Sequence, residues 1–201
     1  MDFATKNAWV KNLFLMTNNL QGDDKTNFIK NLCLSPNVSA DVIQSNITSD
    51  WDWQTLSGNY NITLELISST KDNNWNWKKL SDNNFITWEF ISQNIDLNWD
   101  WKILTYKKFI TLDIILNDLY KNKDWDWNYI SSTLPLTWDN IDSNRNKINF
   151  KSLTRNPNIT LEIISAHPNE DWDYNFLPYK ISIPVRREPT ITELTKTFLN
   201  K

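Results

Sequence analysis

The sequence predicts an all-α protein: an α-solenoid of six to seven two-helix repeats, each about 24 residues long, with a capping helix at each end. Three observations support this prediction. A Trp-Asp-Trp pattern recurs at near-constant spacing, the copies carry two sets of helix-capping residues with Lys147 as the one exception, and 40% of the 201 residues are hydrophobic. Because two short helices cannot bury their apolar faces alone, consecutive copies are expected to stack.

The spacing of the copies is clearest at the second aromatic residue of the pattern. Successive copies of this residue are 24, 24, 26, 23 and 24 positions apart. The residues in this column are Trp53, Trp77, Trp101, Trp127, Phe150 and Tyr174. An aliphatic residue follows three positions later in every copy, and an earlier copy without tryptophan fits the same frame between Ile29 and Asp41. The aligned columns predict copies from about Thr26 to about Ala166, followed by a broken one.

A first short helix, helix A, is expected at the start of each copy. The residue before the first aromatic is of a type that caps helix N-termini. These residues are Asp50, Asn74, Asn98, Asp124 and Asp171, with Thr26 in the early copy. Because the chain has only 2 Gly, asparagines are expected to close helix A in the left-handed conformation. The asparagines in that position are Asn59, Asn83 and Asn156.

A second short helix, helix B, is expected after a column of threonines. Threonine caps helix N-termini, and an acidic residue two positions later favours the positive end of the helix dipole. The threonines are Thr63, Thr87, Thr111, Thr137 and Thr160. The alternative is a β-solenoid, because the stretch Ile62–Ile67 also alternates partly like a strand.

The two ends of the chain depart from the repeat, as solenoid termini do. Residues 1–25 are expected to form an N-terminal cap: an amphipathic helix over residues 3–20, which ends at Gly22, and then a loop. This helix covers the first copy or serves as a docking helix for a partner. Residues 26–177 form the repeat array. Residues 178–201 are expected to form a C-terminal cap, with a Pro-rich segment and a final helix that starts at the capping-box pattern Thr190–Glu193.

The composition excludes several classes of protein. A net charge of −3, with both signs scattered, provides no basic face for nucleic acid. No apolar run approaches the length of a membrane span, which is about 18 residues or more. The N-terminus lacks the pattern of a signal peptide. A single cysteine, Cys33, suits a reducing compartment, so an intracellular and non-secreted location is expected. The oligomeric state stays open.

No residue pattern points to catalysis, a metal or a cofactor. The acidic residues recur in nearly every copy, as helix termini require, whereas a general acid and base pair needs two unique carboxyl groups. His167 is the only histidine, and a zinc site needs more His or Cys ligands. No Gly-rich phosphate loop is present. The chain is therefore not expected to be an enzyme, and no cofactor or metal is expected.

The tryptophans and lysines of helix A give a hypothesis for a binding surface. The second aromatic column is always apolar, so it is expected in the core. The first column is expected to wedge between successive copies or to form an exposed stripe; its members are Trp51, Trp75, Trp99, Trp125 and Trp172. Exposed indoles flanked by lysines make good binding hot spots. The hypothesis places the surface at Trp75, Lys78, Lys79, Trp99, Lys102 and Tyr129.

The repeat resembles a known group of proteins. The unit at Trp51–Ile67, seen again at Trp75–Ile91 with Asn76 for the aspartate, looks like the tandem Trp-Asp-Trp repeats of giant DNA viruses related to mimivirus. The two-helix plan is also similar to leucine-rich repeat variants and, more distantly, to ankyrin arrays. The resemblance implies a viral protein and brings no catalytic residues with it.

The expected function is a non-enzymatic scaffold that mediates protein–protein interaction, because repeated units form an extended surface whose variable positions carry specificity. The main alternative is a structural or virion-associated protein that assembles with itself. Nucleic-acid binding and catalysis are the remaining alternatives.

Overall fold

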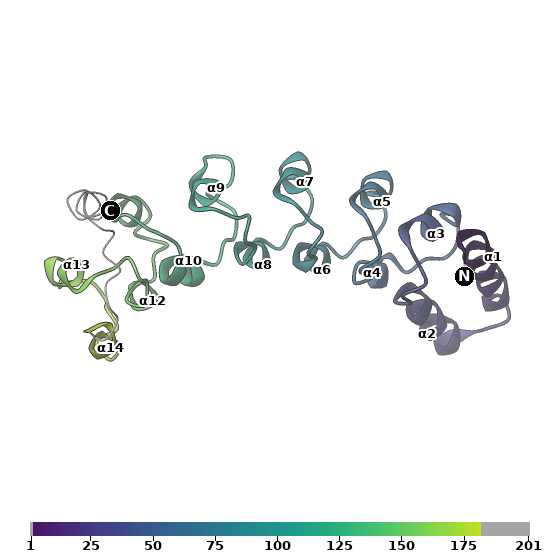
Figure 1. The fold of residues 1–201 in the computed structure, drawn as a ribbon, viewed down its shortest axis with the longest axis horizontal. Helices are drawn as coiled ribbons and strands as arrows, with labels where there is room; N and C mark the ends of the chain where they lie inside the picture. Colours follow the sequence, from purple (N-terminus) through teal and green to yellow (C-terminus); the bar gives the residue numbers. More distant parts are fainter. Residues whose placement is uncertain (1, 182–201) are drawn as a thin grey trace, which may run out of the picture. The chain divides into compact units, whose positions relative to one another are not determined.

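The computed structural model describes residues 2–181, and within this range the chain contains helices and no strand (Figure 1). The all-α prediction is confirmed and the β-solenoid alternative is wrong. The helices are α1 (Phe3–Thr17), α2 (Gly22–Cys33), α3 (Ala40–Ser45), α4 (Trp53–Leu56), α5 (Leu64–Ser69), α6 (Trp77–Asp82), α7 (Trp88–Gln93), α8 (Trp101–Thr105), α9 (Leu112–Leu116), α10 (Trp127–Thr133), α11 (Trp138–Ser143), α12 (Phe150–Leu153), α13 (Leu161–Ala166) and α14 (Leu177–Ile181).

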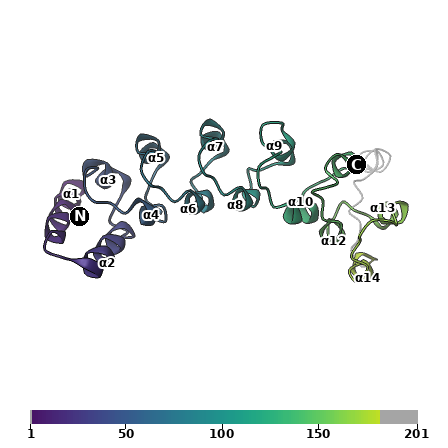
Figure 2. The same ribbon diagram turned by 180° about the vertical axis from the view of Figure 1, so that it is seen from behind.

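The chain forms two compact units, the first comprising Met1–Asp126 and the second beginning at Trp127. In the first unit, α4, α6 and α8 lie in one row, and α5, α7 and α9 lie in a second row (Figures 1 and 2). Helix α6 packs directly against α8. In the second unit, α10 packs against α12, and α13 packs against α14.

Helix A begins two residues later than the sequence predicted. The capping side chain belongs to the residue between the two aromatics, and it accepts a hydrogen bond from the backbone N–H three positions on: Asp52 from Thr55, Asn76 from Lys79, Asp100 from Ile103 and Asn149 from Ser152. The helix therefore starts at the second aromatic residue, and Asp50, Asn74 and Asn98 precede it. The first tryptophan stays outside the helix because its indole is fixed elsewhere, as described below.

Helix B begins where the sequence predicted. Each threonine of the capping column lies in extended backbone, and its hydroxyl accepts a hydrogen bond from the N–H three residues later, at Leu66, Phe90, Ile114, Asn140 and Ile163. The acidic residue lies in the first turn in each case, for example Glu65 and Glu89. The apolar residues that follow, such as Ile67 and Ile91, are fully buried.

The prediction that asparagines close helix A in a left-handed conformation is wrong. Within the described residues, positive φ occurs only at Gly22. Asn59 and Asn156 are instead buried, and their side chains bond to the preceding copy: Asn59 donates to the carbonyl of Cys33 at 2.6 Å, and Asn156 to that of Ser131 at 2.8 Å. Lys107 and Lys180 occupy the same column and donate to preceding carbonyls through their ammonium groups. These four residues link copies, whereas Asn83 is the C-cap of α6, in extended rather than left-handed backbone.

The N-terminal segment also differs from its prediction. Helix α1 ends at Thr17, and Gly22 is the first residue of α2 rather than the end of α1, so residues 22–25 are helical and not a loop. Helix α1 packs against α3 and buries Val10 and Phe14, and the Phe14 ring meets Trp51 edge-on with centroids 4.7 Å apart. Pro178 lies in the first turn of α14, where proline is tolerated. The predicted helix from Thr190 lies outside the described residues.

Small buried hydroxyl groups connect one copy to the next. Ser81 donates to the carbonyl of Trp77 in its own helix at 2.7 Å and accepts from the backbone N–H of Asp100, the next helix cap, at 2.9 Å. The same hydrogen bond, from a backbone N–H to a hydroxyl of the preceding copy, recurs from Asn76 to Ser57, from Asp126 to Thr105, from Asn149 to Ser131 and from Asp173 to Thr154. Cys33 holds the equivalent place beside the N–H of Asp52 and is buried, as the sequence predicted.

Candidate functional site

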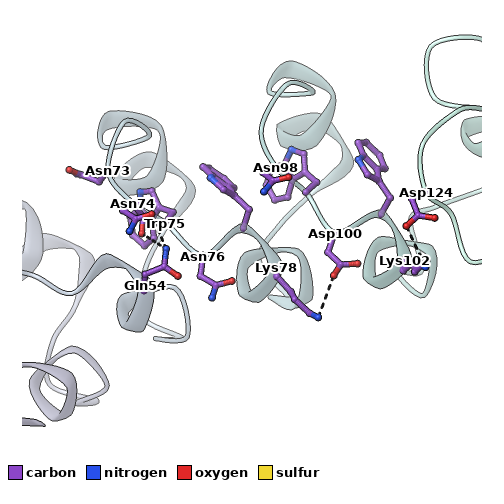
Figure 3. Close-up of a pocket in the computed structure, with 13 residues that line it drawn as sticks. Gln54, Asn73, Asn74, Trp75, Asn76, Lys78, Asn98, Asp100, Lys102 and Asp124 are labelled. Carbon is purple, nitrogen blue, oxygen red and sulfur yellow. Dashed lines mark hydrogen bonds and ion pairs between the residues drawn. The ribbon is translucent and has the colours of Figure 1, made fainter.

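A groove in the first unit runs across the starts of three successive helices A. Its walls are Gln54 of α4, the stretch Asn73–Lys78, the stretch Asn98–Lys102, and Asp124. Its volume is about 640 Å³, which falls in the range of small-molecule and peptide pockets. We call this feature the Asn–Trp groove. Its lining includes the residues on either side of each helix cap, and Figure 3 shows the charged side chains Lys78, Asp100, Lys102 and Asp124 beside it.

The first tryptophan of each pair is buried, and its indole N–H group has a hydrogen-bond acceptor in the protein. Trp75 is 3% exposed and Trp99 is 4% exposed. Each indole N–H donates to the carbonyl five residues earlier, Trp75 to Thr70 at 3.0 Å and Trp99 to Asn94 at 2.9 Å. Trp51, Trp125 and Trp172 repeat this bond. The bond ties the turn after helix B to the next copy and keeps the first tryptophan outside helix A.

The second tryptophan of each pair has a free N–H group. Trp77 meets Trp99 edge-on with ring centroids 5.1 Å apart, and Trp101 meets Trp125 at 5.0 Å. Every buried side-chain nitrogen or oxygen among the described residues has a hydrogen-bond partner. The indole nitrogens of Trp77 and Trp101 have no protein acceptor, so they reach the surface. Trp77 is half-buried rather than a full core residue.

The charges of the groove are balanced. Lys78 pairs with Asp100 at 3.8 Å, and Lys102 pairs with Asp124 at 3.4 Å (Figure 3). The two lysine side chains are 75% and 61% exposed, so these pairs contribute little to folding stability. In the first copy Gln54 replaces the lysine and donates to both the carbonyl and the side-chain oxygen of Asn74. The rim thus carries two positive and two negative side chains.

The side-chain amides of the groove asparagines are only partly used within the protein, and Asn74 and Asn76 retain donor capacity alone. The side-chain oxygen of Asn76 accepts from the backbone N–H of Lys79 at 3.0 Å, and that of Asn74 accepts from Gln54 at 3.0 Å. Their NH₂ groups remain available. Within residues 2–181, the side-chain amides of Asn73 and Asn98 have no hydrogen-bond partner. Indole and amide donors therefore face the groove in successive copies.

The structure brings together four of the six residues of the predicted surface. Trp75, Lys78, Trp99 and Lys102 line the Asn–Trp groove. Lys79 is outside it, and its ammonium donates to the carbonyl of Gln54 at 3.2 Å. Tyr129 belongs to the second unit, in α10, and is half-buried.

The prediction that Trp75 and Trp99 are exposed anchors is wrong, because neighbouring copies cover their rings. The alternative reading of this column, a wedge between copies, describes them correctly. The sequence argument assigned the second aromatic column to the core. This is confirmed for Trp101, which is 8% exposed, and wrong for Trp77, which is half-buried. The argument missed that the indole N–H of each lacks a protein acceptor. It also missed the asparagines. Their signal is visible in the sequence: an amide or acid recurs between the two tryptophans and just before them.

Comparison with known proteins adds nothing to this description: no protein-family model matches the chain, and searches of curated proteins and solved structures found no significant similarity.

Other chemically reactive groups are accounted for by packing. His167 caps the C-terminus of α13 and stacks on Trp138 with ring centroids 3.5 Å apart. Burial raises the pKa of the Cys33 thiol to about 11, although the nearby N–H of Asp52 lowers it. Among the described residues, no group of three or more His, Cys, Asp or Glu side chains can hold a metal ion. None of the helices in residues 2–181 has both the length and the apolar character needed to cross a membrane.

Proposed function

We propose that this chain is a non-enzymatic repeat scaffold, an α-solenoid of six to seven two-helix copies, which binds an extended segment of a partner protein in the Asn–Trp groove. The observation that carries the proposal is the repetition of the groove's donors. Each copy contributes a second-column tryptophan and, three positions before it, a side-chain amide, at Asn74–Trp77 and again at Asn98–Trp101. A ligand with repeating acceptors, such as a polypeptide backbone, matches such a row.

The charges of the groove favour a protein segment over a nucleic acid. A single-strand binder combines stacking aromatics with a positive groove that follows the phosphates. Here each groove lysine faces an aspartate, Lys78 with Asp100 and Lys102 with Asp124. The whole chain carries a net charge of −3. A phosphate backbone would meet as many negative as positive side chains.

The proposal is tested by peptide display. A library of random linear peptides is selected against the protein, and the enriched peptides are measured by fluorescence polarisation against three forms of it. The double variant Lys78→Glu and Lys102→Glu changes the groove rim, and both side chains are exposed enough for the fold to tolerate the change. The matched control is Lys108→Glu, an exposed lysine outside the groove.

We expect the selected peptides to bind the wild-type protein and the control equally and the double variant more weakly, because four carboxylates along the rim would repel the carbonyl acceptors of a bound peptide. Peptides that bind all three forms equally would show that the groove is not the site.

A second candidate is self-assembly, the structural or virion-associated alternative, and the exposed apolar residues of α1 favour it. Phe3 is 49% exposed, Trp9 43%, Leu15 59% and Met16 61%. Exposed apolar side chains that share a helix face mark interaction surfaces, and Trp9 and Met16, seven residues apart, share one face of α1. Sedimentation velocity at rising protein concentration tests this candidate. A sedimentation coefficient that grows with concentration in the wild-type protein, and stays constant in Leu15→Lys with Met16→Lys, would support assembly through α1.

A further inference from the structure

The hydrogen-bonding capacity of the Asn–Trp groove is strongly one-sided. Indole groups donate only, so Trp77 and Trp101 can bind only acceptors. The oxygens of Asn74 and Asn76 already accept bonds within the protein, so their remaining capacity is also that of donors. The acidic side chains Asp100 and Asp124 are engaged with lysines. The amide oxygens of Asn73 and Asn98 are still free to accept, but the free indole and amide N–H groups outnumber them. A ligand that offers more acceptors than donors therefore fits this groove best.

A polyproline II segment has this complementary character. Its backbone makes no internal hydrogen bonds, so every carbonyl is free to accept. Proline lacks a backbone N–H, so a proline-rich segment brings no donor that must find an acceptor in the groove. An ordinary extended peptide would instead bury backbone N–H groups against a surface with few free acceptors. Each N–H that loses its hydrogen bond to water and gains none in the groove costs free energy of binding.

The period of such a segment also fits the period of the groove. Polyproline II has three residues per turn and a rise of about 3.1 Å, which gives a repeat of roughly 9 Å. Packed helices such as α6 and α8 are typically about 8–10 Å apart. One turn of the ligand therefore advances by one copy, and equivalent carbonyls meet equivalent indole N–H groups. Aromatic-lined grooves are a known mode of polyproline II recognition.

The charge of the groove gives no preference for a charged occupant. Two lysines and two aspartates leave no net charge along the rim. A basic or an acidic segment would meet both members of each pair, Lys78 with Asp100 and Lys102 with Asp124, so attraction and repulsion would largely cancel. A neutral proline-rich segment matches this balance.

We infer, on the basis of the proposed function, that the partner segment of the Asn–Trp groove is an uncharged, proline-rich stretch in the polyproline II conformation, whose carbonyls accept from the N–H groups of Trp77 and Trp101. The indole rings supply apolar contact to the proline rings, and the amides of Asn74, Asn76 and Asn98 bind the remaining carbonyls.

The test uses a fluorescein-labelled oligoproline of about 12 residues, roughly 37 Å long, and a Gly-Ser peptide of equal length as a flexible control. The variants Trp77→Phe and Trp101→Phe remove the N–H and keep an aromatic ring. The matched control is Trp88→Phe, a half-buried tryptophan outside the groove. We expect Trp77→Phe and Trp101→Phe each to weaken oligoproline binding about three- to tenfold, and Trp88→Phe to leave it unchanged.

A measurement on the wild-type protein avoids reliance on the variants' folding. In ¹⁵N-labelled protein, the indole N–H resonances of Trp77 and Trp101 should shift on addition of oligoproline. Those of Trp75 and Trp99, which already donate to carbonyls, should move little.

The outcomes separate this inference from the proposed function. Display peptides that need the groove but lack proline, together with no oligoproline binding, would overturn the inference and leave the function standing. A protein that binds no peptide through the groove overturns both. Indole shifts caused by soluble glucan oligosaccharides, with none caused by peptides, would also overturn both and point to a carbohydrate ligand.

Discussion

At the scale of single residues, the state of the indole N–H separates two kinds of tryptophan. The indole N–H of the first tryptophan of each pair donates to a backbone carbonyl of the same chain, as Trp75 does to Thr70. The indole N–H of the second tryptophan, as at Trp77, has no acceptor in the protein and can donate to solvent or to a ligand. Two neighbouring tryptophans with the same side chain thus have different roles, one in folding and one in the groove.

This division predicts different stability changes for the same substitution. Trp75→Phe removes an intramolecular hydrogen bond and leaves a void in a site that is 3% exposed, so the free energy of unfolding should fall by about 2 kcal/mol. Trp77→Phe loses no protein hydrogen bond and should cost less than about 1 kcal/mol. Urea denaturation followed by circular dichroism measures both. Equal losses would contradict the assignment of the two columns.

Cys33 predicts a dependence of stability on alkaline pH. Burial raises the pKa of its thiol from an ordinary 9.0 to about 11. Above pH 9 the unfolded chain loses this proton while the folded chain keeps it, so stability is full below pH 9 and is lost as the pH rises toward 11. The loss at the top of this window should be about 1–3 kcal/mol.

The control for this prediction is Cys33→Ser, which places at this position the residue that Ser57 and Ser81 provide elsewhere. The difference in unfolding free energy between the two proteins should be constant below pH 8 and should move in favour of the variant above pH 9. A difference that stays constant up to pH 11 would show that the thiol is not buried.

At the scale of helices, the sequence allowed helix B to be placed but not the start of helix A. Thr87 is the one good capping residue before helix α7, so the choice was unambiguous. Before helix α6, both Asn74 and Asn76 can cap a helix. The choice depends on the Trp75 indole, whose bond to Thr70 is a contact made by the folded turn. A pattern of residue types does not contain this information.

The hydroxyl that joins helix α6 to the cap of α8 predicts a selective effect. Ser81→Ala removes the acceptor of the Asp100 N–H in a buried site, so the free energy of unfolding should fall by about 1–3 kcal/mol. Ser81→Thr should be tolerated much better, because Thr105 makes the same bonds at the next position. Thermal melting of the three proteins tests this. A threonine variant as unstable as the alanine variant would argue against the hydroxyl link.

At the scale of the whole molecule, contacts between neighbouring copies predict that a full copy can be removed. Deletion of residues 75–98 joins Asn74 to Trp99 and keeps the repeat frame, since the step between these tryptophans is 24 residues. In a solenoid each copy contacts only its neighbours, so the shortened protein should fold cooperatively with lower stability.

The control deletion removes residues 75–86, which is half of that copy, and places helix B after helix B. This protein should lose its cooperative unfolding transition and much of its helical circular dichroism. If both deletions unfold the chain, contacts beyond nearest neighbours hold the fold, and the solenoid proposal fails.

The candidate groove shows what sequence patterns can contribute to a site in a repeat protein. Lys78 and Lys102 were found because variable polar positions next to fixed ones stand out. The exposed edge of Trp77 was missed because a column that is always aromatic suggests burial, and Trp101, which is 8% exposed, fits that expectation. One face of a ring can be packed while its N–H edge stays exposed, and only the three-dimensional arrangement distinguishes these cases.

The hydroxyl links also make each junction between copies separately observable. The backbone N–H of Asn76 and that of Asp100 lie outside any helical ladder, yet each is held by a buried serine of the preceding copy. Their protons can exchange with solvent deuterium only when that junction opens. The exchange rates of these amides therefore report how often each junction opens, copy by copy, while the helices on either side remain intact.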